Sequence, residues 1–398
     1  MLRTIKIGNR LIGEGQPCFI VAEAGANHEG QFQKALELVD AALSTKADAI
    51  KFQHYTAGKL ASKEARRYWF VRGDEKGYQF DPSFYKETQI ETFAKIDGIP
   101  RGKDAELFDY AWQKGIVPFS TPFDFASVDH LEKLGAPMYK IASGDLTYHQ
   151  LLAYVARTGK PIVLSTGAAS LDEIRSAVNV IKKAGNNQII LLHCTLAYPT
   201  PLENINLLMM KHLQEEFPDV MIGLSDHTPG VEADAAASIL GAVMIEKHFT
   251  HTPGAASGAN RVGESPDHDI GLGTVSFTEM VRRVREDEKQ KLSVRYGLSF
   301  EKAVQLIKSG QFLQVLGGDK KVVDEKVELK ARAQARRSVV AALAMQKGMK
   351  ITQEMLGTHF EIKRPGTGIA PFELEKLVGK TLKADVASDA VMRWEHFA

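Results

Sequence analysis

The feature that most constrains the fold is a pattern that recurs eight times in the first 250 residues. A short apolar run, often β-branched, ends in polar residues, and an amphipathic helical stretch follows. Continuous apolar runs of this length are typical of parallel strands that are buried on both faces. The runs occupy residues 19–23, 49–53, 117–121, 139–143, 162–166, 189–193, 221–225 and 243–248.

The segments between the runs indicate what kind of sheet they form. Helical stretches are predicted at 33–43, 170–185 and 231–241, and the last two end at glycines that favour a helix stop. Eight strand–helix units within about 250–290 residues match a (β/α)₈ TIM barrel. A doubly wound sheet is the alternative, but no Gly-x-Gly-x-x-Gly turn follows the first run.

The pattern changes after residue 290, so the sequence predicts a second, smaller domain. Residues 1–290 form the barrel, 291–336 a linker or arm, and 337–398 a compact domain of short alternating runs and turns. Two long inserts, 58–104 (rich in aromatic residues) and 251–273, follow predicted strands. We therefore expect both inserts at the carboxyl-terminal rim, where barrel enzymes build their sites.

Charge and hydropathy exclude two classes of partner. The 398 residues include 50 Lys and Arg against 49 Asp and Glu, so the basic excess typical of nucleic-acid binding is absent. No run approaches the roughly 20 apolar residues that span a bilayer, and residues 1–10 lack the apolar core of a signal peptide. We expect a cytoplasmic protein without a membrane partner, in which Cys18 and Cys194 are buried thiols.

Polar residues gather at the ends of the predicted strands, which meet at one rim of a barrel. Lys51 and Lys140 are the most informative, because each stands between apolar residues where an unpaired ammonium would be costly. Either barrel carboxylates pair with them, or an anion such as phosphate binds between them and the hydroxyls of Thr121, Ser143 and Ser225. The other strand-end residues are Glu23, Asn27, His28, Gln53, Asp145, Thr166, His193, Thr195, Asp226, His227, Glu246, Lys247 and His248.

Two of these strand-end residues suggest a metal site. His227 and His248 end consecutive predicted strands, so their imidazoles can converge on one ion, with water and substrate in the other positions. The carboxylates Glu23 and Asp267 support this interpretation. His193 falls within an apolar run and is interpreted as a core or supporting histidine.

At these residues the sequence resembles a known family, the sialic acid (nonulosonate) synthases. The matching segments follow the family's order and cover nearly the whole chain. They are VAEAGANHEG (21–30), DAIKFQ (48–53), FSTPFD (119–124), YKIASGDL (139–146), PIVLSTG (161–167), LLHCTLAYPTP (191–201), IGLSDHT (222–228), IEKHFT (245–250), SPDH (265–268), RRS (336–338) and KRPGTGIAP (363–371). The resemblance implies a (β/α)₈ barrel followed by a small antifreeze-like β-clip (SAF) domain, in a domain-swapped homodimer.

The resemblance also implies a reaction and the residues that perform it. Phosphoenolpyruvate would condense with an open-chain N-acylated hexosamine, such as N-acetylmannosamine or a 2,4-diacetamido sugar, to a nine-carbon 2-keto acid and phosphate. His227 and His248 would bind Mn²⁺ or Mg²⁺, and Arg364 would reach the sugar in the partner subunit. The implied phosphoenolpyruvate site is Lys51, Gln53, Thr121, Lys140, Ser143 and Ser225, the sugar site Glu23, Tyr198, Asp267 and Arg364, and the catalytic set Glu23, Asp145, His227 and His248.

Departures from the family leave the sugar open. Asp145 stands where many members carry Glu, and Leu196 where some carry Asn. One alternative is another phosphoenolpyruvate-dependent condensation that makes an eight-carbon keto acid, which would need a second phosphate site. Further alternatives are an aldolase that forms a Schiff base at Lys140 and a non-catalytic carbohydrate- or ice-binding protein.

Overall fold

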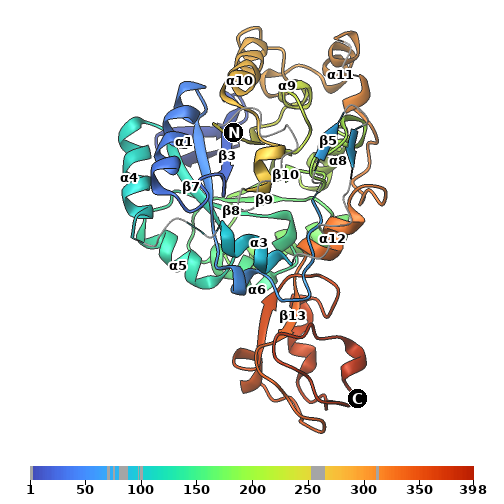
Figure 1. Cartoon of the computed structure of the whole chain (residues 1–398). Coiled ribbons are helices and arrows are strands. Elements are labelled where there is room, and N and C mark those ends of the chain that lie inside the picture. The colour runs from blue at the N-terminus through green and yellow to red at the C-terminus, as the bar shows by residue number, and fades with distance from the viewer. Residues whose placement is uncertain are drawn as a thin grey trace.

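The computed structural model describes residues 3–69, 72–74, 77–79, 88–96, 98, 102–251, 265–310 and 313–398. Eight parallel strands close into a barrel in chain order, and the last pairs with the first (Figure 1). The predicted barrel is therefore confirmed. Its strands are β3 (Phe19–Gly25), β4 (Ala49–His54), β7 (Val117–Pro122), β8 (Tyr139–Ile141), β9 (Ile162–Ser165), β10 (Ile189–His193), β11 (Met221–Asp226) and β12 (Met244–His248).

Helices cover the outside of the barrel, and their boundaries follow local signals. Ser170 and Glu173 form a capping box at the start of α7, so two backbone N–H groups that lack helical partners are satisfied there. The helices bury apolar side chains such as Leu38, Ile174 and Leu213 against the strands. They are α1 (Phe32–Ser44), α4 (Asp104–Lys114), α5 (Phe125–Lys133), α6 (His149–Ala156), α7 (Leu171–Lys183), α8 (Met209–Glu216), α9 (Glu232–Ile239), α10 (Thr274–Lys289) and α11 (Phe300–Ser309). Within the described ranges, no helix is long and apolar enough to cross a membrane.

A β-hairpin closes the amino-terminal end of the barrel, and no pattern described above predicts it. Strands β1 (Thr4–Ile7) and β2 (Arg10–Gly13) pair antiparallel. Ile5, Ile7 and Ile12 of this hairpin are buried in one apolar cluster with Phe19 and Phe119 from inside the barrel. The barrel interior is thus sealed at this end.

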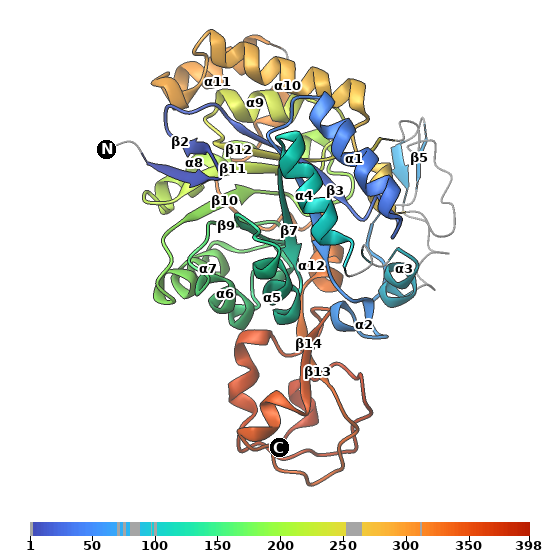
Figure 2. The same ribbon diagram turned by 90° about the vertical axis from the view of Figure 1, so that its left-hand side faces the viewer.

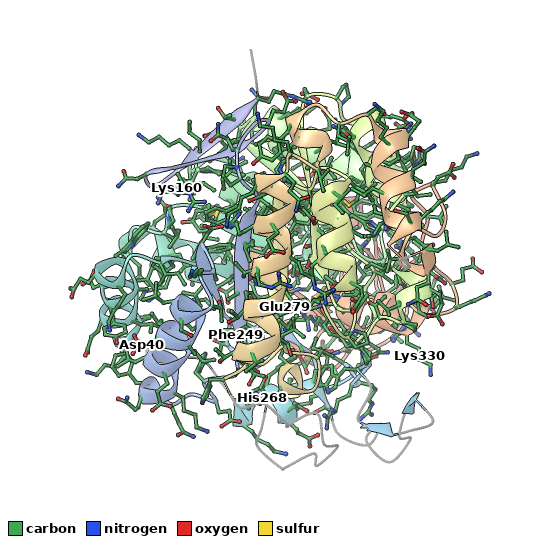
Figure 3. All side chains as sticks on the ribbon, turned by 90° about the horizontal axis from the view of Figure 1, so that it is seen from above. Asp40, Lys160, Phe249, His268, Glu279 and Lys330 are labelled. Atoms are coloured by element: carbon green, nitrogen blue, oxygen red, sulfur yellow. The ribbon has the colours of Figure 1, made fainter. Side chains whose placement is uncertain are left out.

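The two inserts are described only in part. The first contains α2 (Ala57–Leu60), the short antiparallel pair β5 (Arg72–Asp74) and β6 (Gly77–Gln79), and α3 (Gln89–Lys95). Residues 252–264 of the second insert lie outside the described residues, as do the aromatic residues at positions 70, 80, 84 and 85 of the first. Figure 3 views the barrel from above and labels Phe249, just after β12, and Glu279 on α10.

The segment predicted as a linker or arm, residues 291–336, contains helices and packs on the barrel. It contains α11 and α12 (Leu329–Ala335), and Ile307, Val315 and Leu316 join the main core of the barrel. The small domain follows as a separate unit beneath the barrel in Figures 1 and 2, next to α6 and α12. It pairs β13 (Ser338–Ala341) with β14 (Phe360–Lys363), has its own apolar core, and contains a 3₁₀ helix, η9 (Pro371–Leu377).

Candidate active site

A pocket opens at the carboxyl-terminal ends of the strands, opposite the sealed end. Alternate residues of a strand point to the same face, so Lys51 and Gln53 of β4 both face the barrel interior. The pocket is lined by every predicted site residue except Asp145. These lining residues are Glu23, Lys51, Gln53, Thr121, Lys140, Ser143, Tyr198, Ser225, His227, His248, Asp267 and Arg364.

The two strand lysines are held by barrel carboxylates. Lys51 Nζ lies 2.5 Å from Glu23 Oε2 and 3.9 Å from Glu246 Oε2, and Lys140 Nζ lies 3.0 Å from Glu246 Oε1. Hydrogen bonds to Thr121 (3.0 Å from Lys51) and from Ser225 (3.2 Å to Glu246) extend the network. Of the two alternatives left by the sequence, carboxylate partners are observed. The lysines still face the pocket, so an anionic ligand can reach them.

Burial and mutual attraction set the protonation of this cluster. Burial would lower the pKa of Lys51, but Glu23 and Glu246 outweigh that effect and raise it. Burial would raise the pKa of Glu246, but Lys140 and Lys51 hold it below its usual range. Glu23 differs, because burial and the nearby Glu246 raise its pKa despite Lys51. The pocket therefore combines a charged Lys51 with a carboxyl group that can exchange a proton.

The two predicted histidines lie side by side at the ends of β11 and β12. Their ring centroids are 5.3 Å apart, and the ring of Tyr198 lies 4.3 Å from that of His227. Burial lowers the pKa of His227 to about 4 and that of His248 well below its usual value. Both imidazoles are therefore neutral near pH 7, which is the form that binds metal ions.

A group of three ligand residues at the pocket includes one of the two predicted histidines. Ligand atoms of Glu23, His248 and Asp267 all lie within 4.8 Å of one another, whereas His227 directs Nδ1 to the Thr195 carbonyl oxygen at 3.1 Å. His248 Nδ1 is buried, has no hydrogen-bond partner among the described residues, and lies 3.6 Å from Asp267 Oδ2. A divalent cation would satisfy this atom, and Nε2 of His227 remains available as a further ligand.

Asp267 reaches the pocket from the segment between β12 and α10. It belongs to the 3₁₀ helix η5 (Pro266–Asp269), which Ser265 caps by accepting a hydrogen bond from the Asp267 N–H. The neighbouring His268, labelled in Figure 3, contacts Thr250 Oγ1 at 2.8 Å and Glu29 Oε1 at 3.2 Å. These contacts fasten η5 to the barrel rim, so the carboxylate of Asp267 has a defined position.

Asp145, which the resemblance places in the catalytic set, is not among the described residues that line the pocket. Its carboxylate forms a fully buried ion pair with Arg337, with Nε 2.6 Å from Oδ1. Arg337 also donates hydrogen bonds to the carbonyl oxygens of Leu60 (3.2 Å) and Phe123 (3.0 Å). Asp145 therefore anchors the start of the small domain on the barrel through its ion pair with Arg337.

Arg364 lines the pocket of its own chain, whereas the sequence-based expectation places it in the pocket of a partner. Its backbone N–H donates to the Leu60 carbonyl oxygen at 3.0 Å, and its guanidinium donates to Gln89 Oε1 at 3.2 Å. The guanidinium also lies over the rings of Phe93 (5.7 Å) and Phe123 (5.6 Å). The small domain can thus complete a site in one chain, and exchange between two chains stays a prediction.

Several lining residues received no predicted role. Glu246 was named only as a strand-end residue, although it stands two residues before His248 and the alternation of β12 places both on the inner face. Tyr68, Trp69 and Phe93 form an aromatic wall of the pocket. They come from an insert without helical or strand periodicity, so its aromatic content was apparent but the direction of its side chains was not.

The fold and pocket define a class: a barrel enzyme whose buried lysines, neutral histidines and carboxylates meet at the carboxyl ends of the strands. Comparison with known proteins makes the class specific. The NeuB family model matches residues 38–295 and the SAF domain model residues 336–398. The chain belongs to the NeuB family, which confirms the resemblance to sialic acid synthases.

Three relatives show how far the likeness extends. The chain is 36% identical to an uncharacterized protein of Methanocaldococcus jannaschii, over 99% of this chain and 98% of the relative. It is 33% identical to the N,N'-diacetyllegionaminic acid synthase of Legionella pneumophila, over 96% of each. The solved structure of the Bacillus subtilis spore coat polysaccharide biosynthesis protein SpsE matches with a TM-score of 0.75 at 29% identity, covering 100% of this chain and 99% of that one.

Proposed function

We propose that this protein condenses phosphoenolpyruvate with an open-chain N-acylated hexosamine to give a nine-carbon 2-keto acid and inorganic phosphate. The observation that carries the proposal is one buried pocket in which two lysines stand beside neutral histidines and carboxylates. Phosphoenolpyruvate needs the cations, and the aldehyde of the sugar needs an electrophilic partner. Relatives that are named as synthases of legionaminic acid support the same reaction class.

Lys51 and Lys140 are proposed to bind the anionic groups of phosphoenolpyruvate. Charge-assisted hydrogen bonds from lysine to phosphate or carboxylate are about twice as strong as neutral ones. The hydroxyls of Thr121, Ser143 and Ser225 and the amide of Gln53 complete the set. Because Glu23 and Glu246 already hold both ammonium groups in place, little reorganisation is needed when the ligand enters.

The carboxylates are proposed to act where positive charge develops. C3 of phosphoenolpyruvate forms a bond to the aldehyde carbon, which leaves alkoxide charge on the sugar oxygen and positive charge at C2. Water then adds to C2 and gives up a proton, a proton neutralises the alkoxide, and phosphate leaves as the C2–O bond breaks. Glu23 can accept the proton of that water, since its raised pKa suits proton exchange, and Glu246 can stabilise the charge at C2.

A divalent ion, Mn²⁺ or Mg²⁺, fits the donor set of His248, Asp267 and Glu23, with His227 as a further ligand. When bound, it would supply Lewis-acid polarisation of the sugar aldehyde. The chain's own part is to keep both imidazoles neutral by burial and to present them from adjacent strands.

The sugar is proposed to lie between Tyr198, Asp267 and Arg364, against the aromatic wall of Tyr68, Trp69 and Phe93. N-acetylmannosamine and a 2,4-diacetamido sugar are both candidates, and the legionaminic acid synthase relative favours the second. A condensation that gives an eight-carbon product from a phosphorylated sugar is less favoured. Among the described lining residues, Arg364 alone remains as a cation for a second phosphate, and it already contacts Gln89.

The decisive experiment is a panel of N-acylated hexosamines incubated with the protein, phosphoenolpyruvate and Mn²⁺. We expect phosphate release with at least one open-chain amino sugar and a product mass equal to that sugar plus pyruvate. Arabinose 5-phosphate serves as the substrate of the eight-carbon alternative. Phosphate release with that sugar and with none of the amino sugars would refute the proposal.

We further propose that the contacts of Arg364 also form between two chains of a homodimer. Domain exchange preserves the interface and changes only the connecting segment, so the same contacts serve either arrangement. Mixing inactive His248→Ala and Arg364→Ala proteins should restore activity, because one site of a mixed dimer then carries neither defect. If subunit exchange is demonstrated and the mixture stays inactive, each arginine serves its own barrel.

A further inference from the structure

A second group of metal-ligand side chains lies outside the pocket. His54 ends β4, Asp104 begins α4, and His130 lies on α5; ligand atoms of all three are within 4.8 Å of one another. Helices α4 and α5 are neighbours on the outside of the barrel in both Figure 1 and Figure 2. The preceding residue, Gln53, lines the pocket, so His54 projects from the opposite face of the same strand.

The carboxylate of Asp104 is oriented by the backbone. Its Oδ1 accepts hydrogen bonds from the N–H groups of Gly102 (3.0 Å) and Ala105 (3.1 Å), and the residue is buried. Its Oδ2 faces His54 Nε2 at 3.5 Å and contacts His130 Nε2.

The imidazole of His54 is also oriented, by a residue on the neighbouring strand. Its Nδ1 lies 2.7 Å from Ser120 Oγ on β7. When Nδ1 donates its proton to that hydroxyl, Nε2 carries the lone pair that points at Asp104. Histidines that bind metals are typically oriented in this way, with the second ring nitrogen donating to a fixed acceptor.

An ion pair between Asp104 and one histidine explains this arrangement less completely than a metal site does. One protonated histidine would satisfy Oδ2 of Asp104, yet two imidazoles direct Nε2 at the same oxygen. Two histidines and one carboxylate whose ligand atoms lie within 4.8 Å of one another are a ligand set for divalent transition metals. The side chains of His54 and His130 are 14% and 26% exposed, so an ion and its water ligands can enter.

We propose that His54, Asp104 and His130 form a second metal site, for Zn²⁺ or a similar transition ion, with a structural role. On binding, the metal takes the place of the contact between His130 Nε2 and Asp104, and both groups become ligands. The ion would join α4 and α5 to β4. It would thereby stabilise the part of the barrel where Gln53 and Thr121 pair across β4 and β7 at the pocket. The proposal is independent of the reaction assigned to the pocket.

The test uses the full-length protein with the pocket metal site removed. His248→Ala protein is stripped with chelator, incubated with Zn²⁺, dialysed, and analysed for metal content and melting temperature. We expect one zinc per chain and a zinc-dependent rise in melting temperature. Adding His130→Ala should abolish both, whereas adding His359→Ala, which removes a histidine of the small domain, should change neither.

A second variant keeps the test decisive if His130→Ala does not fold. Asp104→Asn retains an oxygen for the N–H groups of Gly102 and Ala105 but removes the charge, so zinc binding should fall at least tenfold. With Co²⁺ in place of Zn²⁺, visible absorption should follow the same pattern. The proposal is overturned if folded His248→Ala protein binds no zinc, or if its zinc is unaffected by the His130 and Asp104 substitutions.

Discussion

The two ends of the barrel interior differ sharply although the same strands build them. Near the amino-terminal end the inward side chains are apolar, as at Val21 and Phe119. Two residues further along the same strands, on the same face, stand Glu23 and Thr121 of the pocket. The barrel interior therefore changes from apolar to charged within two residues along each of these strands.

The apolar layer mainly stabilises the fold, whereas the charged layer mainly serves the pocket. The lower layer, sealed by the β1–β2 hairpin, supplies burial of roughly 1.5–3 kcal/mol for each large apolar side chain. The upper layer buries lysines and glutamates, whose loss of hydration offsets much of their mutual attraction. Substitutions in the two layers should therefore affect different measurements.

The largest effect is expected in the upper layer at His248. His248→Ala removes a ligand of the proposed aldehyde-activating ion, so kcat/KM should fall by about 1,000-fold, or about 4 kcal/mol. The melting temperature in chelator should change little. Phosphate release is measured with and without Mn²⁺, with chelator-treated wild-type protein as the control. Full activity of the variant without added metal would disprove the assignment.

In the lower layer, Phe119→Ala should act on stability instead. Removal of this fully buried ring leaves a cavity and should lower the free energy of unfolding by roughly 3–5 kcal/mol. Thr121→Val, two residues along β7, is the matched change in the upper layer and should mainly raise KM for phosphoenolpyruvate. Denaturant unfolding and steady-state kinetics of both variants make the test. The prediction is contradicted if Phe119→Ala raises KM for phosphoenolpyruvate but leaves the free energy of unfolding unchanged.

A smaller effect is expected when one lysine of the upper layer is removed. Lys51→Ala or Lys140→Ala deletes a charge-assisted contact worth about 1.5–3 kcal/mol, so kcat/KM for phosphoenolpyruvate should fall roughly 10- to 150-fold. Lys160→Ala, which removes a partly exposed lysine that pairs with Glu132 at 2.6 Å, is the control. Unchanged KM and kcat in both pocket variants would make these lysines structural.

The smallest effect concerns a buried histidine outside the pocket. Burial, with a contribution from Lys321, lowers the pKa of His193 to about 3, and its Nε2 lies 2.6 Å from the Ile205 carbonyl oxygen. Below about pH 6.5 the unfolded chain binds a proton there that the folded chain does not, so stability falls as pH drops toward 3. Between pH 7.5 and pH 5, the melting temperature of His193→Gln should fall less than that of the wild-type protein. Equal losses would show that His193 does not contribute.

The sequence alone determined the barrel and most of its pocket. Strand alternation and the convergence of strand ends are local or symmetric properties, so the positions of Lys51, Lys140, His227 and His248 could be predicted from eight short runs. Only the tertiary structure decided that Asp145 pairs with Arg337, 192 positions away. It also showed that ligand atoms of Glu23, His248 and Asp267 lie within 4.8 Å of one another. It also decided the β1–β2 seal, the aromatic wall and the contact of Arg364 with its own barrel. These features are contacts between side chains that are far apart in the sequence, and local sequence periodicity does not predict such contacts.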